Sequence, residues 1–326
     1  MKDLDISLEL IKILSDGSIH LGDNLIQVFG LTFVDFNKHI NILRRLGVEV
    51  NIINNDLYQI TKKIDLLDYK KIYSLVKKGK IFVKSVLNST NQYLLDYLDY
   101  VDQLKSGDAC VAEYQIAGRG RYGRNWISPF GCNLYLSLYW YLEDTRTSIV
   151  GLSLVVAIVI AETLNQLIGS NIKVKWPNDL YLNEKKLAGI LIEMKSKIRY
   201  MVDIIIGIGI NISMSRTHGK KINQNWINLE RSGIKIEKNI IAGKLIVVLR
   251  NELLIFEKYG FAPFIERWLA LDNFLDKKVK LRIGNRDEIG IVKGVNQNGA
   301  ILLKQNGEIF SYCGEIISLS SGDKFY

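Results

Sequence analysis

The stretch Gly118-Arg119-Gly120-Arg121-Tyr122-Gly123-Arg124-Asn125-Trp126 carries the most specific information in this chain. Its first seven residues hold three arginines and three glycines, and an aromatic side chain follows. Glycine lets backbone N–H groups approach a ligand closely and adopt positive φ angles. Arginine supplies a permanently charged, forked donor that matches phosphate or carboxylate oxygens. We interpret the stretch as a loop that closes over a small anion such as a nucleotide phosphate; a solvated basic turn is the alternative.

The same glycines match the dinucleotide-binding pattern Gly-x-Gly-x-x-Gly. That pattern requires a helix directly after the loop, because the helix N-terminus holds the pyrophosphate. Here Pro129 and Gly131 oppose a helix, and the apolar run 134–141 predicts a strand. The order strand, loop, strand argues against a dinucleotide-binding fold and favours an α+β domain.

Charge is distributed unevenly around this loop. The chain of 326 residues has a net charge of +9, which suggests polyanionic partners. Residues 1–65 carry seven basic and nine acidic side chains, and residues 271–326 carry eight and seven. The middle segment, 66–270, holds the remaining 28 basic and 18 acidic side chains. The positive field therefore belongs to the segment that contains the loop.

Three segments with different patterns predict three domains. Residues 1–65 show three short amphipathic segments, the third opening at the plausible N-cap Thr32, and then an alternating hairpin around 54–56. This predicts a winged helix-turn-helix domain. Residues 66–270 mix strand runs with helical runs, which predicts a mixed α/β domain. Residues 271–326 contain short strands separated by Asn/Gly turns, which predicts a small β-barrel.

Several function classes are disfavoured. Cys110, Cys132 and Cys313 form no C-x-x-C pair, so structural disulfides and zinc ribbons are not expected, and a reducing cytoplasm is the natural setting. The three histidines have no metal-ligand spacing, and we assign no metal ligands. The N-terminus lacks the pattern of a signal peptide. The longest apolar stretch, Ile149 to Ala161, is too short to span a bilayer and predicts a buried helix.

Three further clusters place polar residues at strand ends: Lys173 to Leu180, Lys185 to Glu193, and Gly207 to Asn211. Each alone is also compatible with an ordinary turn or hairpin. Four stretches in the family's order and spacing resemble the signature motifs of biotin protein ligases: Gly118–Arg124, Lys175–Tyr181, Lys186–Glu193 and Gly207–Asn211. Ser89-Thr90-Asn91 lies upstream of them, as in the family. With the predicted winged helix, the chain resembles the bifunctional type that also acts as biotin operon repressor. The resemblance covers nearly the whole chain.

The resemblance implies a central domain of the class II synthetase-like type and an SH3-like C-terminal barrel. It implies that biotin and ATP, with Mg²⁺, give biotinyl-5′-AMP, and that biotin then passes to one lysine of the biotin carboxyl carrier protein of acetyl-CoA carboxylase. Both reactants of the first step are anions, so positioned cations must offset their repulsion. Operator DNA and a ligand-linked homodimer are further expectations of the family, and no membrane is involved.

The implied site residues fall into three groups. Lys186, Arg121 and Asp179 would act at the reacting carboxylate and phosphate, with Asp179 assisting the metal or the incoming lysine. Thr32, Lys38, Arg44 and Arg45 would contact DNA. The residues that would bind biotin or the adenylate are Ser89, Thr90, Asn91, Gln115, Gly118, Arg119, Gly120, Arg121, Arg124, Trp126, Lys186, Gly189, Gly207 and Asn211. Residues 214–225 look like a second closing loop.

The sequence departs from the family pattern at two places. Tyr122 stands where a basic or polar residue is usual. The predicted recognition helix carries Phe33 and Asp35 where small and basic residues are expected, and its domain is slightly acidic, which weakens DNA binding through counterion release. These departures leave open a ligase whose winged helix no longer regulates. A repressor that only senses the adenylate is disfavoured because the catalytic motifs are intact, and the loop 118–124 argues for biotin against a lipoate-type ligase on the same scaffold.

Overall fold

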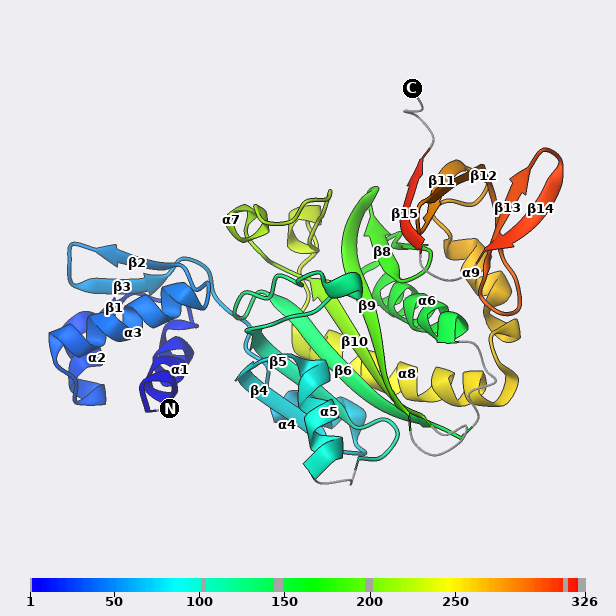
Figure 1. Ribbon diagram of the computed structural model, residues 1–326. Coiled ribbons are helices and arrows are strands. Elements are labelled where there is room, and N and C mark those ends of the chain that lie inside the picture. Colours follow the sequence, from blue (N-terminus) through cyan, green and yellow to red (C-terminus); the bar gives the residue numbers. More distant parts are fainter. Residues whose placement is uncertain (1, 101–103, 144–148, 197–201, 313–315, 322–326) are drawn as a thin grey trace.

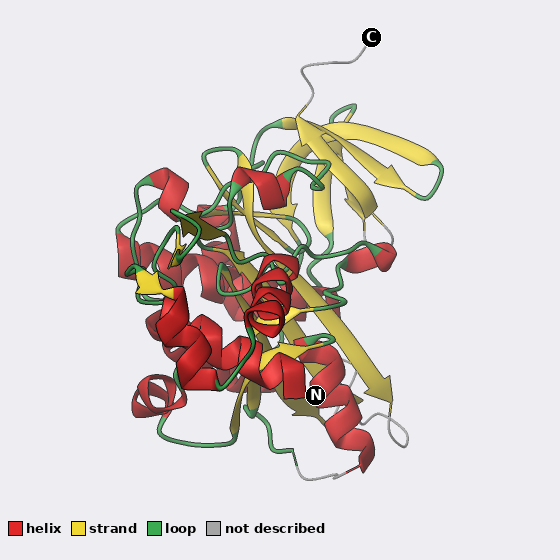
Figure 2. Cartoon of the chain, turned by 90° about the vertical axis from the view of Figure 1, so that its left-hand side faces the viewer, coloured by secondary structure: helices red, strands yellow, loops and turns green. Residues whose placement is uncertain are grey.

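The computed structural model describes residues 2–100, 104–143, 149–196, 202–312 and 316–321. Along these residues lie three β-sheets, of three, seven and five strands. Figure 1 shows the first sheet with helices α1 to α3 at the left, the seven-stranded sheet in the centre and the five-stranded sheet at the upper right. Figure 2, a quarter turn away, shows the helices gathered around the strands of the central sheet.

The N-terminal unit has the three helices and the hairpin that the sequence predicts. The third helix begins after Thr32, whose hydroxyl accepts a hydrogen bond from the Asp35 N–H at 3.1 Å. The hairpin turns at Asn54 and Asn55, both at positive φ, a conformation that asparagine tolerates. The elements are α1 (Lys2–Leu14), β1 (His20–Leu21), α2 (Gly22–Phe29), α3 (Phe33–Arg45), β2 (Val50–Ile53) and β3 (Leu57–Ile60).

The N-terminal unit packs directly against the segment that follows the Gly/Arg loop. Phe130 is buried within the N-terminal core, and its N–H donates to the Leu46 carbonyl at 2.9 Å. Gly47, at φ +89°, lies so close to Pro129 and His218 that an added Cβ would stand 3.1 Å from each. The end of α3 and the end of the loop segment therefore share one packed junction.

The central sheet is almost entirely antiparallel. Its strands run in the order β4-β5-β6-β10-β9-β8-β7, and only β4 and β5 pair in parallel. A strand, β6, does follow the Gly/Arg loop, as expected. The bounds are β4 (Ile81–Leu87), β5 (Ala109–Gln115), β6 (Asn133–Leu142), β7 (Lys173–Lys175), β8 (Asp179–Leu182), β9 (Lys185–Ser196) and β10 (Val202–Asn211).

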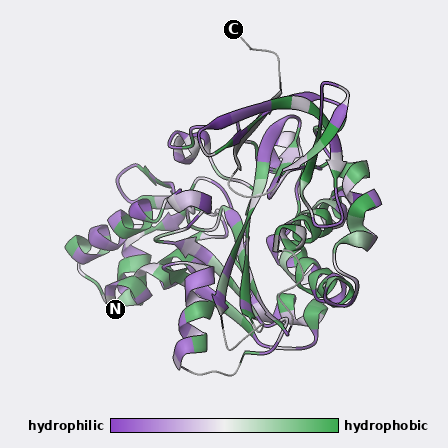
Figure 3. Cartoon of the chain, turned by 45° about the vertical axis from the view of Figure 1, so that its right-hand side comes forward, coloured by the Kyte–Doolittle hydropathy of each residue, from purple (hydrophilic) through white to green (hydrophobic). Residues whose placement is uncertain are grey.

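Helices cover both faces of this sheet. Along β10, Ile204 and Ile206 belong to the main core, and Ile205, between them, packs with the residues beneath the helix that starts at Thr90. This alternation is the period of a strand buried on both faces. Figure 3 shows hydrophobic residues along the sheet and its covering helices. The helices are α4 (Tyr69–Val76), α5 (Thr90–Tyr100), α6 (Ile149–Ile168), α7 (Arg216–Gly219), α8 (Lys238–Tyr259) and α9 (Ile265–Leu271).

Helix α6 is longer than its apolar sequence run suggested. It continues to Ile168, seven residues beyond the apolar run Ile149 to Ala161, and the expectation of a buried helix is confirmed. By length and composition, Val150–Ile168 could cross a membrane, but 67% of this window is buried inside the protein. The helix packs against α8, α9 and β9. Burial in the core accounts for its apolar composition.

The C-terminal sheet lies against the strand that leads to the Trp176–Pro177 turn. Trp176 Nε1 donates to the Gly299 carbonyl at 2.9 Å, and Val174 pairs with Asp272. The strands are β11 (Lys278–Ile283), β12 (Arg286–Val295), β13 (Ile301–Gln305), β14 (Glu308–Tyr312) and β15 (Ile316–Ser321), in the order β14-β13-β12-β11-β15.

The described cysteines are unpaired and unreactive. Cys110 is buried and Cys132 is half-buried. Burial raises the pKa of the Cys132 thiol to about 11 and shifts the pKa of Cys110 further upward. Cys110 belongs to a small hydrophobic cluster, Cys132 is not among the buried core residues, and Cys313 lies outside the described residues.

Candidate active site

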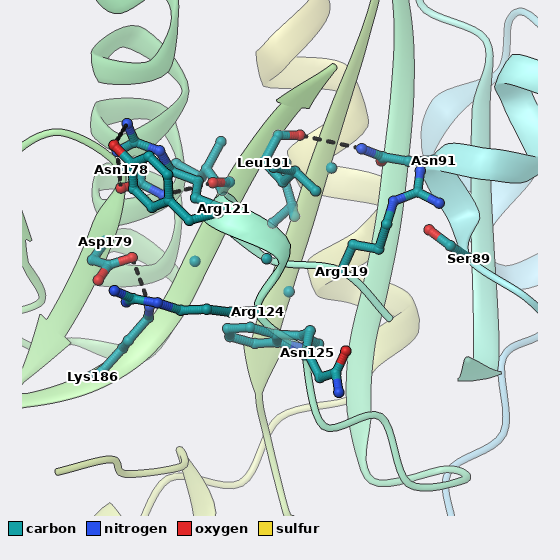
Figure 4. Close-up of a pocket in the computed structure, with 18 of the residues that line it drawn as sticks. Ser89, Asn91, Arg119, Arg121, Arg124, Asn125, Asn178, Asp179, Lys186 and Leu191 are labelled. Atoms are coloured by element: carbon teal, nitrogen blue, oxygen red, sulfur yellow. Dashed lines mark hydrogen bonds and ion pairs between the residues drawn. The ribbon is translucent and has the colours of Figure 1, made fainter. Parts of the chain in front are cut away.

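A cavity of about 380 Å³ lies between the Gly/Arg loop, the start of α5 and strands β9 and β10. Figure 4 shows polar side chains from these elements converging on it. The cavity brings together 13 of the predicted site residues: Ser89, Thr90, Asn91, Gln115, Arg119, Gly120, Arg121, Arg124, Trp126, Asp179, Lys186, Gly189 and Gly207.

Two predicted binding residues lie outside this lining. At Gly118 an added Cβ would stand 2.5 Å from the Trp126 carbonyl oxygen, so glycine allows the two ends of the loop to close on each other. The Asn211 amide donates to the Ile227 carbonyl at 3.2 Å and holds the chain that returns from the second loop. Both residues support the walls of the cavity.

One end of the cavity is a neutral hydrogen-bonding cluster. Gln115 Oε1 accepts from the Thr90 N–H at 2.9 Å, and Gln115 Nε2 donates to Ser128 Oγ at 3.0 Å. Ser137 Oγ and Thr90 Oγ1 are hydrogen-bonded to each other at 2.7 Å. Thr90, Gln115 and Ser128 are buried, and satisfied buried groups of this kind are held rigidly. This end can bind a neutral polar group without rearrangement.

Trp126 forms part of the floor because two strands carry glycine beneath it. A Cβ at Gly209 would stand 2.4 Å from the indole ring, and one at Gly189 would stand 3.0 Å from it. Trp126 Nε1 is buried and has no hydrogen-bond partner among the described residues. The indole therefore lies against the sheet, as a flat apolar surface inside the cavity.

The opposite end of the cavity is cationic. Lys186 Nζ lies 2.8 Å from Asp179 Oδ1, in an ion pair whose geometry is not that of a hydrogen bond. The two side chains are only 14% and 19% exposed. Arg121 Nη1 donates to Asn178 Oδ1 at 3.1 Å. These cations from two separate segments can neutralise charge on a phosphate or carboxylate.

Two polar residues of this end, Lys175 and Asn178, were not among the predicted site residues, although both belong to the cluster 173–180. Lys175 Nζ donates to the Tyr181 hydroxyl at 3.2 Å. Burial lowers the pKa of Lys175, and the charge of Lys186 lowers it further, against the opposing effect of Asp179. Asn178 anchors Arg121. The cluster predicted a site, but its turn geometry was needed to show which side chains point inward.

Tyr122 is a lining residue with an unusual backbone conformation. Its φ is +58°, and its ring lies under the Arg121 guanidinium at 5.0 Å. Its hydroxyl accepts from Arg121 Nη2 at 3.1 Å. The departure from the family pattern therefore adds a second contact that positions Arg121.

The predicted DNA contacts lie on α3, away from the cavity. Thr32 caps the helix, and Lys38 is engaged in an ion pair with Asp35 at 2.8 Å. Arg44 and Arg45 are exposed in the last turn. Of these four residues, Arg44 and Arg45 are the charged ones that form no ion pair with a described carboxylate.

Comparison with known proteins agrees with this geometry. The model of the Biotin/lipoate A/B protein ligase family matches residues 83–211. The chain is 48% identical, over 99% of its own length and 100% of the relative's, to the bifunctional ligase/repressor BirA of Salmonella typhimurium. This chain belongs to the bifunctional ligase/repressor family. The recognition made from the motifs is confirmed.

Other members of the wider family are also similar. A biotin–[acetyl-CoA-carboxylase] ligase of Paracoccus denitrificans is 30% identical over 61% of this chain and 85% of its own. A solved structure of the biotin protein ligase of Aquifex aeolicus, in complex with biotin and ATP, superposes with a TM-score of 0.65 at 27% identity. The match covers 74% of this chain and 99% of that chain. The mixed α/β ligase fold is thereby established.

Proposed function

We propose that this protein is an ATP-dependent biotin protein ligase that forms biotinyl-5′-AMP and transfers biotin to a lysine of biotin carboxyl carrier protein. One observation carries the proposal: a single cavity has a neutral hydrogen-bonding end around Gln115 and a cationic end around Lys186 and Arg121. A ureido ring needs neutral donors and acceptors, and an acyl phosphate needs cations. The two ends match the two ends of biotinyl-5′-AMP.

In the first step, a biotin carboxylate oxygen attacks the α-phosphorus of ATP, the bond to the β-phosphate breaks, and pyrophosphate leaves. Lys186 and Arg121 offset the repulsion between the two anions and stabilise charge on the phosphoryl oxygens. Trp126 supplies a flat apolar wall that excludes water from the mixed anhydride.

In the second step, the acceptor lysine amine attacks the anhydride carbonyl and AMP leaves. The amine must lose a proton to become nucleophilic. Asp179 is the carboxylate beside Lys186 in the cavity and is the residue that we assign to accept this proton or to orient the amine.

Mg²⁺ fits the donors of this cavity only as a partner of the nucleotide. Within the described ranges, no group of three or more His, Cys, Asp or Glu side chains could hold a metal ion. Asp179 is the one carboxylate among the described lining residues. Mg²⁺ commonly uses one or two carboxylates together with substrate phosphates, so Asp179 would be its protein ligand, and Mg²⁺ would neutralise phosphate charge.

We propose the same three domains that the sequence suggests: 1–65 as a winged helix-turn-helix, 66–270 as a class II synthetase-like catalytic domain, and 271–326 as an SH3-like barrel. Three helices followed by the β2–β3 hairpin support the first assignment, and the five antiparallel strands support the last. We also propose the regulatory role of the family. In that role the protein binds operator DNA in the cytoplasm as a homodimer whose formation is linked to its ligand.

One assay distinguishes the alternatives. The full-length protein is incubated with ATP, apo carrier protein and either biotin or lipoate, and acyl transfer is followed by mass shift of the carrier. Transfer of biotin, with AMP formed in equal amount, is the expected result. Transfer of lipoate alone would assign the lipoate-type ligase, and adenylate bound without transfer would assign a sensing repressor.

A further inference from the structure

Arg119, in the first half of the Gly/Arg loop, is held in place by a carboxylate that sequence analysis did not single out. Arg119 Nη2 donates to both carboxylate oxygens of Glu193, at 2.9 and 2.8 Å. Arg119 Nη1 donates to Gln92 Oε1 at 3.0 Å. The terminal nitrogens of this arginine are therefore used by the protein itself, on β9 and on α5.

Glu193 holds a second cavity residue at the same time. Its Oε2 accepts from Asn91 Nδ2 at 2.7 Å, and Asn91 Oδ1 accepts from Ser137. Asn91 stands directly over Gly207, where an added Cβ would be 2.4 Å from Asn91 Oδ1. One carboxylate thus links the loop to the neutral end of the cavity. Figure 4 shows Arg119 and Asn91 side by side at this end.

The remaining nitrogen of Arg119 is free. Nε is buried and makes no hydrogen bond to any described residue, although Arg119 lines the cavity. A buried N–H of a charged group without an acceptor is costly. An acceptor oxygen supplied by the bound ligand would satisfy it.

We propose that Glu193 is a positioning residue that fixes Arg119 so that its Nε–H, rather than its terminal nitrogens, donates to the bound substrate. This inference rests on the proposed function. It states how residues 118–120, the first half of the loop, take part in binding biotin. Arg119 is a fixed wall of the biotin-binding end, and its partner Glu193 sets both the direction of that donor and the rotamer of Asn91.

The second half of the loop is built differently. Tyr122 and Gly123 have positive φ, and Arg121, with its Asn178 contact, has no carboxylate partner among the described residues. Residues 121–124 therefore lack the carboxylate anchor that Glu193 gives to Arg119 in the first half of the loop. Loss of Glu193 should disturb biotin binding before ATP binding.

Glu193→Gln is the test variant, because it keeps the size of the side chain and removes the charge that Arg119 pairs with. Glu162→Gln is the matched control, since Glu162 makes a comparable two-oxygen pair with Arg267 and neither residue lines the cavity. In pyrophosphate exchange, Glu193→Gln should raise the KM for biotin about tenfold, the scale of one charged hydrogen bond, and leave the KM for ATP nearly unchanged. The control should change neither.

Two further variants separate positioning from simple stability. Arg119→Lys keeps the charge opposite Glu193 but has no Nε donor, so it should lose biotin affinity to a similar degree. Glu193→Asp, which keeps the charge, should recover part of the loss. A wild-type KM for biotin in Glu193→Gln, or a loss that falls equally on ATP, would overturn the proposal. Absence of exchange in the wild-type protein would instead overturn the ligase assignment itself.

Discussion

Lys186 and Asp179 face each other from neighbouring antiparallel strands, with 2.8 Å between Nζ and Oδ1. The Lys186 ammonium also lies over the Trp126 ring, 5.8 Å from its centre. A carboxylate and an indole thus hold the same ammonium from two sides, and its position is set before any substrate arrives. Such preorganisation favours charge stabilisation in the transition state.

Lys186→Ala removes this cation, and we expect pyrophosphate release to fall by roughly 100-fold or more, the cost of losing one preorganised charge contact. Lys185→Ala is the control, because Lys185 is the exposed neighbour of Lys186 and does not line this cavity. Normal pyrophosphate release by Lys186→Ala, measured with a coupled phosphate assay, would remove Lys186 from the reaction.

Arg121→Gly should release biotinyl-5′-AMP from the enzyme. Among the described residues, Asn178 and Tyr122 hydrogen-bond to the Arg121 side chain, and without this side chain we expect the cationic end of the cavity to open to water. The measurement is the rate at which free adenylate appears after rapid filtration. An adenylate retained as long as in the wild-type protein would contradict a closing role for Arg121.

Lys238→Met should destabilise the folded protein strongly. Lys238 and Glu113 form an ion pair in which the side chains are 3% and 5% exposed, so the variant leaves a buried carboxylate without its partner. We expect the free energy of unfolding to fall by about 3–5 kcal/mol, measured by urea titration. The double variant Glu113→Gln/Lys238→Met should recover much of this loss; equal losses in both would place the effect elsewhere.

The stability of the protein should depend on the protonation of Asp272. Burial raises the pKa of this carboxyl to about 6, against hydrogen bonds from Phe274 and Trp268. The pKa of Asp272 in the folded protein therefore lies above its value of about 4 in the unfolded chain. The contribution of protonated Asp272 to the free energy of unfolding is fully present below pH 4 and is lost as the pH rises through 6.

Asp272→Asn removes this titration. As the pH rises from 5 to 7, the melting temperature of the variant should therefore increase relative to that of the wild-type protein. A difference between the two proteins that stays constant across this range would show that Asp272 does not titrate there.

Binding to operator DNA should depend on Arg44 and Arg45. Because Lys38 is already paired with Asp35, these two exposed arginines are the phosphate contacts that α3 offers. In gel shifts with biotin operator DNA and saturating biotin, each alanine substitution should reduce the salt slope by about 1. No shift of the wild-type protein at low salt would leave the N-terminal unit without a role in DNA binding.

The order of motifs predicted the family and most of the residues that line the cavity. This was possible because strands that pair in one sheet bring the segments at their ends close together. Ser89 to Asn91, the Gly/Arg loop, Asp179 and Lys186 lie far apart in sequence, and all meet at one cavity. Elements without a strong period were missed: α4, β4 and β15.

The partner of each charged residue could not be predicted. Nothing in the sequence pairs Arg119 with Glu193 across 74 residues, or Glu113 with Lys238 across 125 residues. Such contacts depend on side-chain direction in the folded state. The sequence therefore predicted Arg119 as a ligand contact without the carboxylate that orients it.

The junction at Leu46 and Gly47 also restricts how this sequence can evolve. A substitution of Gly47 must accommodate both Pro129 and His218, and the backbone of Leu46 binds that of Phe130. Residues at the end of α3 are thus selected for how they fit the ligand loop as well as for what the N-terminal unit contacts. Substitutions at the end of α3 are therefore expected to appear together with compensating substitutions in the segment that follows the Gly/Arg loop, and the reverse.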